Sequence, residues 1–219
     1  MKKGFLWIHR LIPDYARMML ILLAVGQLFT YYFPRIVGLG ELMDFSVSLD
    51  GRIPLIPAFA YVYVLGFVFW TVNYVLIVRQ DKRVCVRLFA ADMICKAVCV
   101  VCFFAIPSTI AQPAKEEIAG PGAWLLRIVY AMDEPNNLLP SMHCYVSYLA
   151  WRPMLNREVK KGIPAGYRAF SLIFALLVCL STLFTRQHVF LDFVTGVAMA
   201  EIAWQLARLI RVPAENGND

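Results

Sequence analysis

Six long apolar runs set the limits on what this chain can fold into. They cover residues 15–33, 54–78, 88–110, 138–155, 167–185 and 189–210. A helix needs about 20 mainly apolar residues to cross the roughly 30 Å hydrocarbon core of a bilayer. The chain is 60% hydrophobic and only 16% charged, which lies outside the usual composition of soluble domains. The sequence therefore predicts an all-α integral membrane protein with six membrane-spanning helices.

The basic residues predict how these helices are oriented. Most of the 21 Lys and Arg residues lie in the N-terminal segment, in the loops after the second and fourth runs, and in the tail. Loops that retain Lys and Arg stay in the cytoplasm, so both termini are expected there. The first run lacks a cleavage site and is expected to remain as a helix. The net charge of +6 follows from this topology and from attraction to anionic lipids, so no nucleic-acid partner is implied.

The sequence contains no internal repeat, which favours a single domain over residues 1–219. Its functional core is expected at about 88–210, and a disordered tail at 212–219. Cys95, Cys99 and Cys102 recur at helical spacing without a nearby histidine or Cys-x-x-Cys pair. Such residues are typical of helix packing. We therefore predict no metal site, no cofactor and no disulfide, and leave the oligomeric state open.

Two polar clusters interrupt the apolar pattern. The stretch "NNLLPSMHCYVSYLAWRP" at 136–153 begins a run with Ser141 and His143, and "STLFTRQHVFLD" at 181–192 carries Arg186, His188 and Asp192. The predicted topology brings both clusters to the extracytoplasmic end of the bundle. Asp192 follows His188 by four residues, a spacing that lets the carboxylate hold one ring nitrogen. A single histidine could be a satisfied interfacial residue, but ionisable groups gathered at one depth indicate a functional site.

These residues resemble motifs of the phosphatidic acid phosphatase type 2 superfamily. "PSMH" at 140–143 resembles its Pro-Ser-x-His motif, and "HVFLD" at 188–192 resembles its His-x-x-x-Asp motif. "LDGRIPLIP" at 49–57 and "YAMDEPNNLLPSMH" at 130–143 are similar to segments of bacterial members. The resemblance covers about residues 45–205. It implies the six-helix fold of the membrane-embedded branch, in a bacterial plasma membrane with an extracytoplasmic active site.

The resemblance also implies roles for individual residues. His188 would attack phosphorus and form a phosphohistidine, Asp192 would orient it, and His143 would protonate the leaving oxygen. Ser141 and Arg186 would hold the phosphoryl oxygens. The expected activity is metal-independent hydrolysis of a phosphomonoester or pyrophosphate lipid, the substrate being a membrane lipid phosphate.

The chain departs from the family in its basic residues. The family's first motif is a Lys followed seven residues later by Arg-Pro, whereas this chain has Ala105 and, before Pro113, Gln112. In the third motif, Thr182 stands where the family has an arginine after Ser181. Gln112 and Arg186 are therefore candidate phosphate-binding residues at the altered positions. Arg127 is another candidate, although it could equally be an interfacial anchor beside aromatic residues.

Two other functions stay open. The same departures resemble the lipid phosphotransferase branch, which includes sphingomyelin synthases and inositol phosphorylceramide synthases and passes the phosphoryl headgroup to a lipid alcohol. A non-catalytic transporter is the third possibility, because polar residues lie within the apolar runs. Lys96 and Glu201 lie at similar predicted depths at 1.5 Å per residue. We expect them to form a buried ion pair, with Asp92 nearby.

Overall fold

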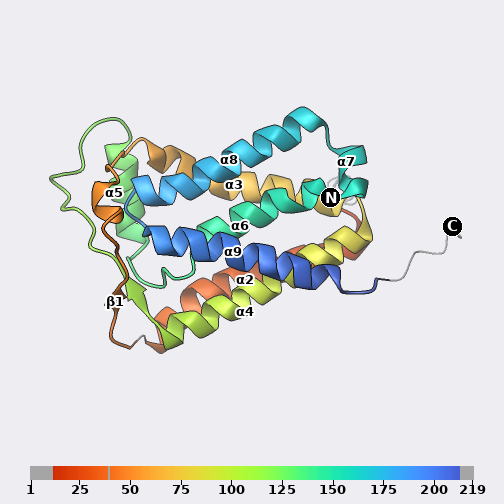
Figure 1. Cartoon of the computed structure of the whole chain (residues 1–219), viewed down its shortest axis with the longest axis horizontal. Coiled ribbons are helices and arrows are strands. Elements are labelled where there is room, and N and C mark those ends of the chain that lie inside the picture. Colours follow the sequence, from red (N-terminus) through yellow and green to blue (C-terminus); the bar gives the residue numbers. More distant parts are fainter. Residues whose placement is uncertain (1–11, 39, 213–219) are drawn as a thin grey trace, which may run out of the picture.

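The computed structural model describes residues 12–38 and 40–212, which form a bundle of long helices with loops at each end (Figure 1). The helices and strands are α2 (Asp14–Val37), β1 (Met43–Asp44), η1 (Asp50–Arg52), α3 (Phe59–Val78), α4 (Lys82–Ala105), β2 (Ser108–Thr109), α5 (Ala123–Met132), α6 (Met142–Trp151), η2 (Arg152–Leu155), α7 (Arg157–Gly162), α8 (Ala165–Phe184) and α9 (Phe190–Arg208). The part of the predicted tail beyond residue 212 lies outside the described residues.

Five helices are long and apolar enough to cross a membrane, namely α2, α3, α4, α8 and α9. Each matches one of the predicted runs. Local signals fix their starts: α8 follows Pro164, which suits a helix N-terminus, and Asp81 caps α4 by accepting a hydrogen bond of 3.0 Å from the Val84 N–H. The prediction of an all-α membrane protein is therefore supported by five candidate spans.

The predicted fourth span is different. Helix α6 has only 10 residues and continues as the short 3-10 helix η2; at 1.5 Å per residue α6 is about 15 Å long, half the thickness of the hydrocarbon core. The residues before α6 are not helical, because the Leu138 and Leu139 N–H groups donate to the Ser108 hydroxyl at 3.0 and 2.9 Å. Most α6 residues are buried. Helix α6 thus lies inside the bundle, among α3, α4, α8 and α9.

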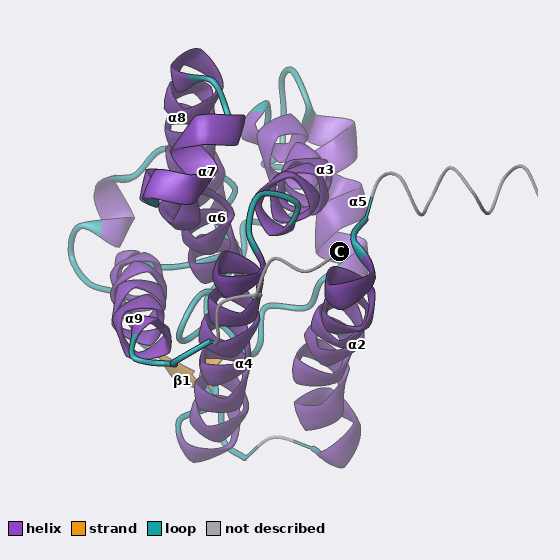
Figure 2. Cartoon of the chain, turned by 90° about the vertical axis from the view of Figure 1, so that its right-hand side faces the viewer, coloured by secondary structure: helices purple, strands orange, loops and turns teal. Residues whose placement is uncertain are grey.

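Seen from the end that carries α7, the helices surround this inner helix (Figure 2). Helix α2 begins and α9 ends at the α7 end, whereas α5, β1 and the loop before α6 lie at the opposite end (Figure 1). Trp70 of α3 donates a hydrogen bond of 2.8 Å to Ser147 of α6, and Trp204 of α9 and Tyr145 of α6 are among the largest buried side chains. The core therefore forms around α6, and the loops on either side of it meet at one end.

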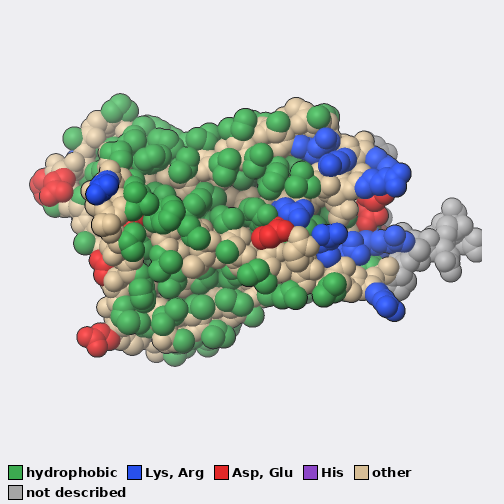
Figure 3. All heavy atoms as spheres, viewed as in Figure 1, with side chains coloured by type: hydrophobic (Ala, Val, Ile, Leu, Met, Phe, Trp, Pro, Cys, Tyr) green, Lys and Arg blue, Asp and Glu red, His purple; other side chains and the backbone are tan. Residues whose placement is uncertain are grey.

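The surface has an apolar middle and a basic end. Hydrophobic side chains cover most of the middle of the face drawn in Figure 3, and Lys and Arg gather at the α7 end. Exposed members of this basic end include Arg79, Arg157, Lys160, Lys161 and Arg208. The basic loops of the described chain therefore lie together at the end opposite β1 and α5.

The predicted ion pair between Lys96 and Glu201 is wrong. Lys96 pairs with Asp92 of its own helix, and Asp92 also accepts a hydrogen bond of 2.6 Å from Tyr74. Glu201 instead accepts bonds of 2.8 and 3.1 Å from Arg152. Rise per residue predicts the depth of a side chain but not the direction in which it points around the helix axis. The two pairs are separate, and the partner of Glu201 is Arg152 of η2.

Candidate active site

The turn between α8 and α9 holds one half of the candidate site. The Gln187 and His188 N–H groups both donate to the Thr182 carbonyl, at 3.0 and 3.1 Å. The side chain of His188 is buried, and its Nδ1 lies 3.2 Å from Oδ2 of Asp192. Helix α9 begins only at Phe190. The predicted contact is thus present, but it arises because Asp192 in the first turn of the helix reaches back to a residue that precedes the helix.

Asp192 does two things at once. Its Oδ2 accepts a 3.0 Å hydrogen bond from the Val189 N–H as well as facing His188. Its Oδ1 is buried and has no hydrogen-bond partner. Because the carboxylate holds Nδ1, the imidazole is fixed with Nε2 as the nitrogen that can act on a substrate.

Asp50 is a supporting residue of this turn that sequence reasoning missed. It is buried, its Oδ1 accepts a 2.7 Å bond from the Phe190 N–H, and its Oδ2 accepts a 2.8 Å bond from the Val47 N–H. Asp50 therefore satisfies an N–H of the first turn of α9 from a distant part of the chain. The similarity of segment 49–57 to bacterial family members was the one signal that pointed to it.

The start of α6 holds the other half. Ser141 is the N-cap of α6: its Oγ accepts a 3.3 Å bond from the Cys144 N–H, and its own N–H donates to the Asp192 carbonyl at 3.1 Å. Helix α6 begins at Met142, whereas the predicted run begins at residue 138. Ser141 is fully buried. Its hydrogen bonds to Cys144 and Asp192 connect the two halves of the site.

The two histidines meet between these halves. The ring centres of His143 and His188 are 6.0 Å apart, with an angle of 59° between the rings. An attacking nitrogen lies about 3–3.5 Å from its target, and a proton donor lies about 2.7–3.0 Å from its acceptor. With the phosphorus–oxygen bond between them, two nitrogens that act on one phosphoryl group lie about 7 Å apart. The two imidazoles would therefore separate slightly to admit such a group. The Nε2 atom of His143 is buried without a partner.

Aromatic rings of α3 surround His143. Its ring stacks on Tyr63 with centroids 4.2 Å apart, and it meets Trp70 and Phe67 edge to face at 5.2 and 5.7 Å. The side of His143 away from His188 is therefore apolar.

The electrostatics of His188 follow from its carboxylate partner. Burial alone would lower the pKa of His188. The hydrogen bond and negative charge of Asp192 outweigh burial, so that the pKa of His188 lies above its ordinary value. A nucleophilic imidazole must be unprotonated at the attacking nitrogen, so His188 could act as a nucleophile only at a pH above that raised pKa.

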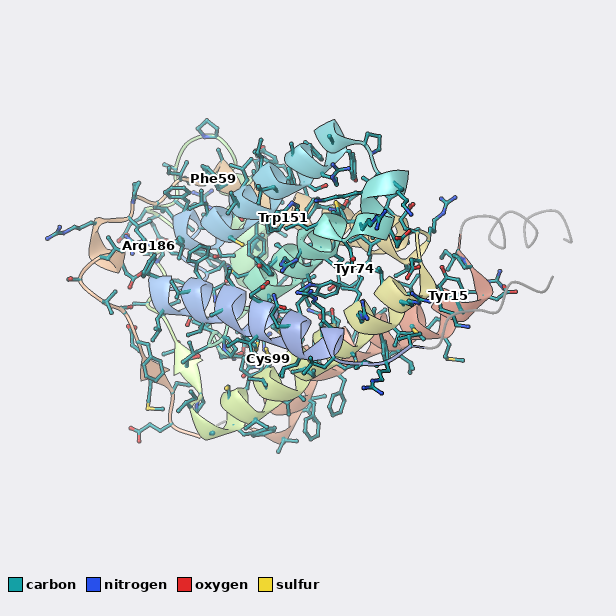
Figure 4. The ribbon with its side chains drawn as sticks, turned by 45° about the vertical axis from the view of Figure 1, so that its right-hand side comes forward. Tyr15, Phe59, Tyr74, Cys99, Trp151 and Arg186 are labelled. Carbon is teal, nitrogen blue, oxygen red and sulfur yellow. The ribbon has the colours of Figure 1, made fainter. Side chains whose placement is uncertain are left out.

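The remaining predicted residues lie elsewhere. Arg186, with φ of 52°, donates to the carbonyls of Asp50 and Ile53 at 2.8 and 2.6 Å. It lines a surface hollow of about 470 Å³ together with Gln112. In Figure 4, Arg186 lies among the loops at one end of the molecule, whereas Tyr74 lies inside the bundle. Arg127 donates to the Ile118 carbonyl at 2.8 Å. The structure thus groups Ser141, His143, His188 and Asp192, and separates Gln112 and Arg186 into a neighbouring hollow.

Gly196 allows the close approach of α9 to the start of α6. A Cβ atom at this position would lie 2.7 Å from the Ser141 carbonyl oxygen, so Gly196→Ala must push the two elements apart. We expect a loss of about 10- to 100-fold in turnover, the cost of a shift of about 1 Å in reacting groups, and a loss of about 1–3 kcal/mol in stability. Steady-state kinetics and thermal unfolding in detergent check both.

Gly166→Ala is the matched control, because a Cβ there meets nothing within 4 Å. We expect wild-type turnover from it. Equal turnover in the two variants would contradict the assignment of the α6–α9 contact to the site.

No group of three or more His, Cys, Asp or Glu residues in the described part of the chain is placed to hold a metal ion. Comparison of the chain with protein-family models, curated proteins and solved structures finds no match. The geometry of the two histidines and their partners is therefore the basis on which a function is inferred.

Proposed function

We propose that this chain is a lipid phosphate phosphatase of the membrane-embedded phosphatidic acid phosphatase type 2 kind. The observation that carries the proposal is the placement of two imidazoles 6.0 Å apart, one of them held by a buried carboxylate, at one end of an apolar helical bundle. The basic loops lie at the opposite end, which by the positive-inside rule makes the site extracytoplasmic. Helix α6, together with η2 and the non-helical residues before α6, would carry the chain across the membrane a sixth time.

The reaction has two steps. Nε2 of His188 attacks phosphorus, the bond from phosphorus to the lipid oxygen breaks, and His143 gives its proton to that oxygen. In the second step His143 takes a proton from water, the water oxygen attacks phosphorus, and the phosphorus–nitrogen bond breaks. Asp192 stabilises the charge that forms on His188 during the first step. Inorganic phosphate and a lipid alcohol are the products, and both histidines return to their starting states.

A lipid phosphotransferase is the second candidate. Arg186 is bound to carbonyl groups away from the histidines, and an altered arginine set is the feature that also resembles the transferase branch. The first step would be unchanged, and a lipid alcohol would replace water in the second. Both candidates therefore share His143, His188 and Asp192.

Reconstitution in vesicles separates the candidates. The purified protein is given labelled phosphatidic acid, phosphatidylglycerol phosphate or undecaprenyl pyrophosphate, with and without diacylglycerol or inositol. Free labelled phosphate in the absence of an acceptor supports the phosphatase. A new labelled compound formed only with an acceptor supports the transferase, namely inositol phosphate with inositol, or phosphatidic acid when diacylglycerol accepts from one of the other two donors. Absence of both products would contradict an enzymatic role on these lipids.

The pH dependence tests the pairing of His188 with Asp192. The rate constant kcat/KM is expected to fall as the pH drops through the raised pKa of His188, because protonated Nε2 cannot attack. In Asp192→Asn the carboxylate charge that favours the protonated ring is gone, so the midpoint of this limb should move to lower pH. The plateau should also fall by about 10²- to 10⁴-fold, since the orientation of the ring is lost. A limb at the same pH in both proteins would show that another group controls it.

A further inference from the structure

A second carboxylate, which is partly buried, lies beside the proposed site, on the side of His143. Asp133 follows α5 directly and is bound by donors from two other helices. Tyr31 of α2 donates to its Oδ1 at 2.5 Å, Tyr63 of α3 donates to its Oδ2 at 2.9 Å, and Arg35 of α2 lies 3.1 Å from Oδ1. Three side chains from two helices, α2 and α3, thus hold one carboxylate at this end of the bundle.

Arg35 is itself held firmly. It donates at 2.5 Å to the Tyr31 hydroxyl and at 3.0 Å to the Glu134 carbonyl, and its guanidinium carbon lies 3.9 Å from the centre of the Tyr31 ring. Its Nε is buried without a hydrogen-bond partner. Among the described residues, Arg35 forms an ion pair with Asp133. The guanidinium therefore offsets the charge of this carboxylate.

Tyr63 connects Asp133 to the site. Its hydroxyl binds Asp133, and its ring stacks on the ring of His143 at 4.2 Å. Burial alone would raise the pKa of Asp133. The hydrogen bond from Tyr31 and the charge of His143, together with the bonds from Tyr63 and Arg35, hold the pKa of this carboxyl below its ordinary value. The carboxylate is thus ionised, and its charge is felt by His143.

An ionised carboxylate next to a phosphate site needs an explanation, because like charges repel the substrate. The benefit falls on His143, whose aromatic surroundings disfavour a charged ring. A nearby negative charge favours the protonated ring, which is the form that can give a proton to a leaving oxygen. The groups that face His143 from the packed elements are His188, Tyr63, Phe67 and Trp70, with Asp133 behind Tyr63.

We infer that Asp133 is a positioning residue that holds and charges His143 through Tyr63, and that Arg35 shields the substrate from the Asp133 carboxylate. Asp133 would then serve the general acid as Asp192 serves the nucleophile. The inference rests on the proposed phosphatase function and adds a specific consequence. Asp133 matters for substrates whose leaving oxygen needs a proton, and Arg35 matters for every phosphate substrate.

Two substrates separate these effects. The leaving group of phosphatidic acid is diacylglycerol, an alcohol whose oxygen requires a proton as it leaves. The leaving group of p-nitrophenyl phosphate is p-nitrophenolate, a stable anion that requires none. The rate constant kcat/KM reports the steps up to release of the alcohol. In Asp133→Asn we expect kcat/KM to fall about 10- to 100-fold for phosphatidic acid, within the range that general acid catalysis supplies, and by less than about 3-fold for p-nitrophenyl phosphate. The ratio of the two is independent of how much protein is folded.

Arg35→Gln is expected to lower kcat/KM by about 10-fold for both substrates, because the bare carboxylate repels phosphate. The double variant Arg35→Gln with Asp133→Asn should recover p-nitrophenyl phosphate turnover but remain slow on phosphatidic acid. Glu134→Gln is the control. Glu134 is the residue after Asp133 and its side chain is exposed, so this variant removes the same charge and should leave both rates unchanged.

The outcomes distinguish this inference from the proposed function. If wild-type protein turns over both substrates but Asp133→Asn lowers both equally, Asp133 is only structural and the inference is overturned alone. If the double variant recovers nothing, the shielding role of Arg35 is overturned. If wild-type protein turns over neither substrate, or His188→Ala retains full turnover of both, the proposed function is overturned and the inference with it.

Discussion

Replacement of His188 by alanine is expected to abolish turnover of lipid phosphates, by at least about 10³-fold. The side chain is the proposed nucleophile, its Nδ1 is engaged by Asp192, and no covalent intermediate can form without it. The protein should remain folded, because the backbone bonds of His188 and Gln187 to Thr182 do not need the imidazole. Phosphate release from vesicles and thermal unfolding in detergent measure the two properties.

His143→Ala is the informative comparison. Without the general acid, turnover of phosphatidic acid should fall about 10²- to 10⁴-fold. With p-nitrophenyl phosphate the first step needs no acid, but the second step has lost its base. We therefore expect a burst of p-nitrophenol followed by slow turnover in His143→Ala, and no burst in His188→Ala. A burst in the His188 variant would contradict the assignment of the nucleophile.

Replacement of Asp92 by alanine is expected to cause the largest loss of stability, about 3–5 kcal/mol. Asp92 and Lys96 are 1% and 5% exposed and pair with each other inside the bundle. Removing the carboxylate leaves a buried ammonium group without its partner, and also leaves Tyr74 without its acceptor. Breaking a buried pair in this way costs far more than the pair itself contributes. Thermal or denaturant unfolding of the protein in detergent measures the change.

Two further variants test this explanation. Glu158→Ala breaks an exposed pair with Lys161, and should leave the stability almost unchanged because solvent screens such pairs. The double variant Asp92→Leu with Lys96→Met removes both buried charges, and should recover most of the stability. If the double variant is as unstable as Asp92→Ala, the loss comes from packing and not from the unpaired charge.

The sequence predicted most of what depends on local pattern. Long apolar runs gave five of the expected helices, because burial in lipid requires about 20 residues of one kind. The four-residue spacing brought Asp192 to His188, although the contact forms at a helix start and not along a helix face. Helix α6 was predicted too long, because apolar residues before it are bound to Ser108 in a non-helical segment.

What the sequence did not predict depends on directions and on distant segments. The partners of Lys96 and Glu201 depend on the direction in which each side chain points around its helix axis. The depth of a residue along the axis does not predict that direction. Asp50 reaches the α8–α9 turn from a loop far away in the chain, and Asp133 is held by side chains of α2 and α3. The family similarity of segments 49–57 and 130–143 includes both residues but says nothing of these contacts. The grouping of Arg186 with Gln112 in a separate hollow likewise depends on how segment 50–53 packs on the α8–α9 turn.

Trapping the phosphoenzyme tests most directly whether His188 is the nucleophile. The protein is mixed with phosphatidic acid carrying a radioactive phosphate, denatured at neutral pH within the first turnover, digested, and analysed by mass spectrometry. We expect a phosphoryl group on His188 that survives alkali and is lost in acid. It should be absent from the His188→Ala variant. Turnover without any labelled residue, or with the label on Ser141 or Asp192, would contradict it.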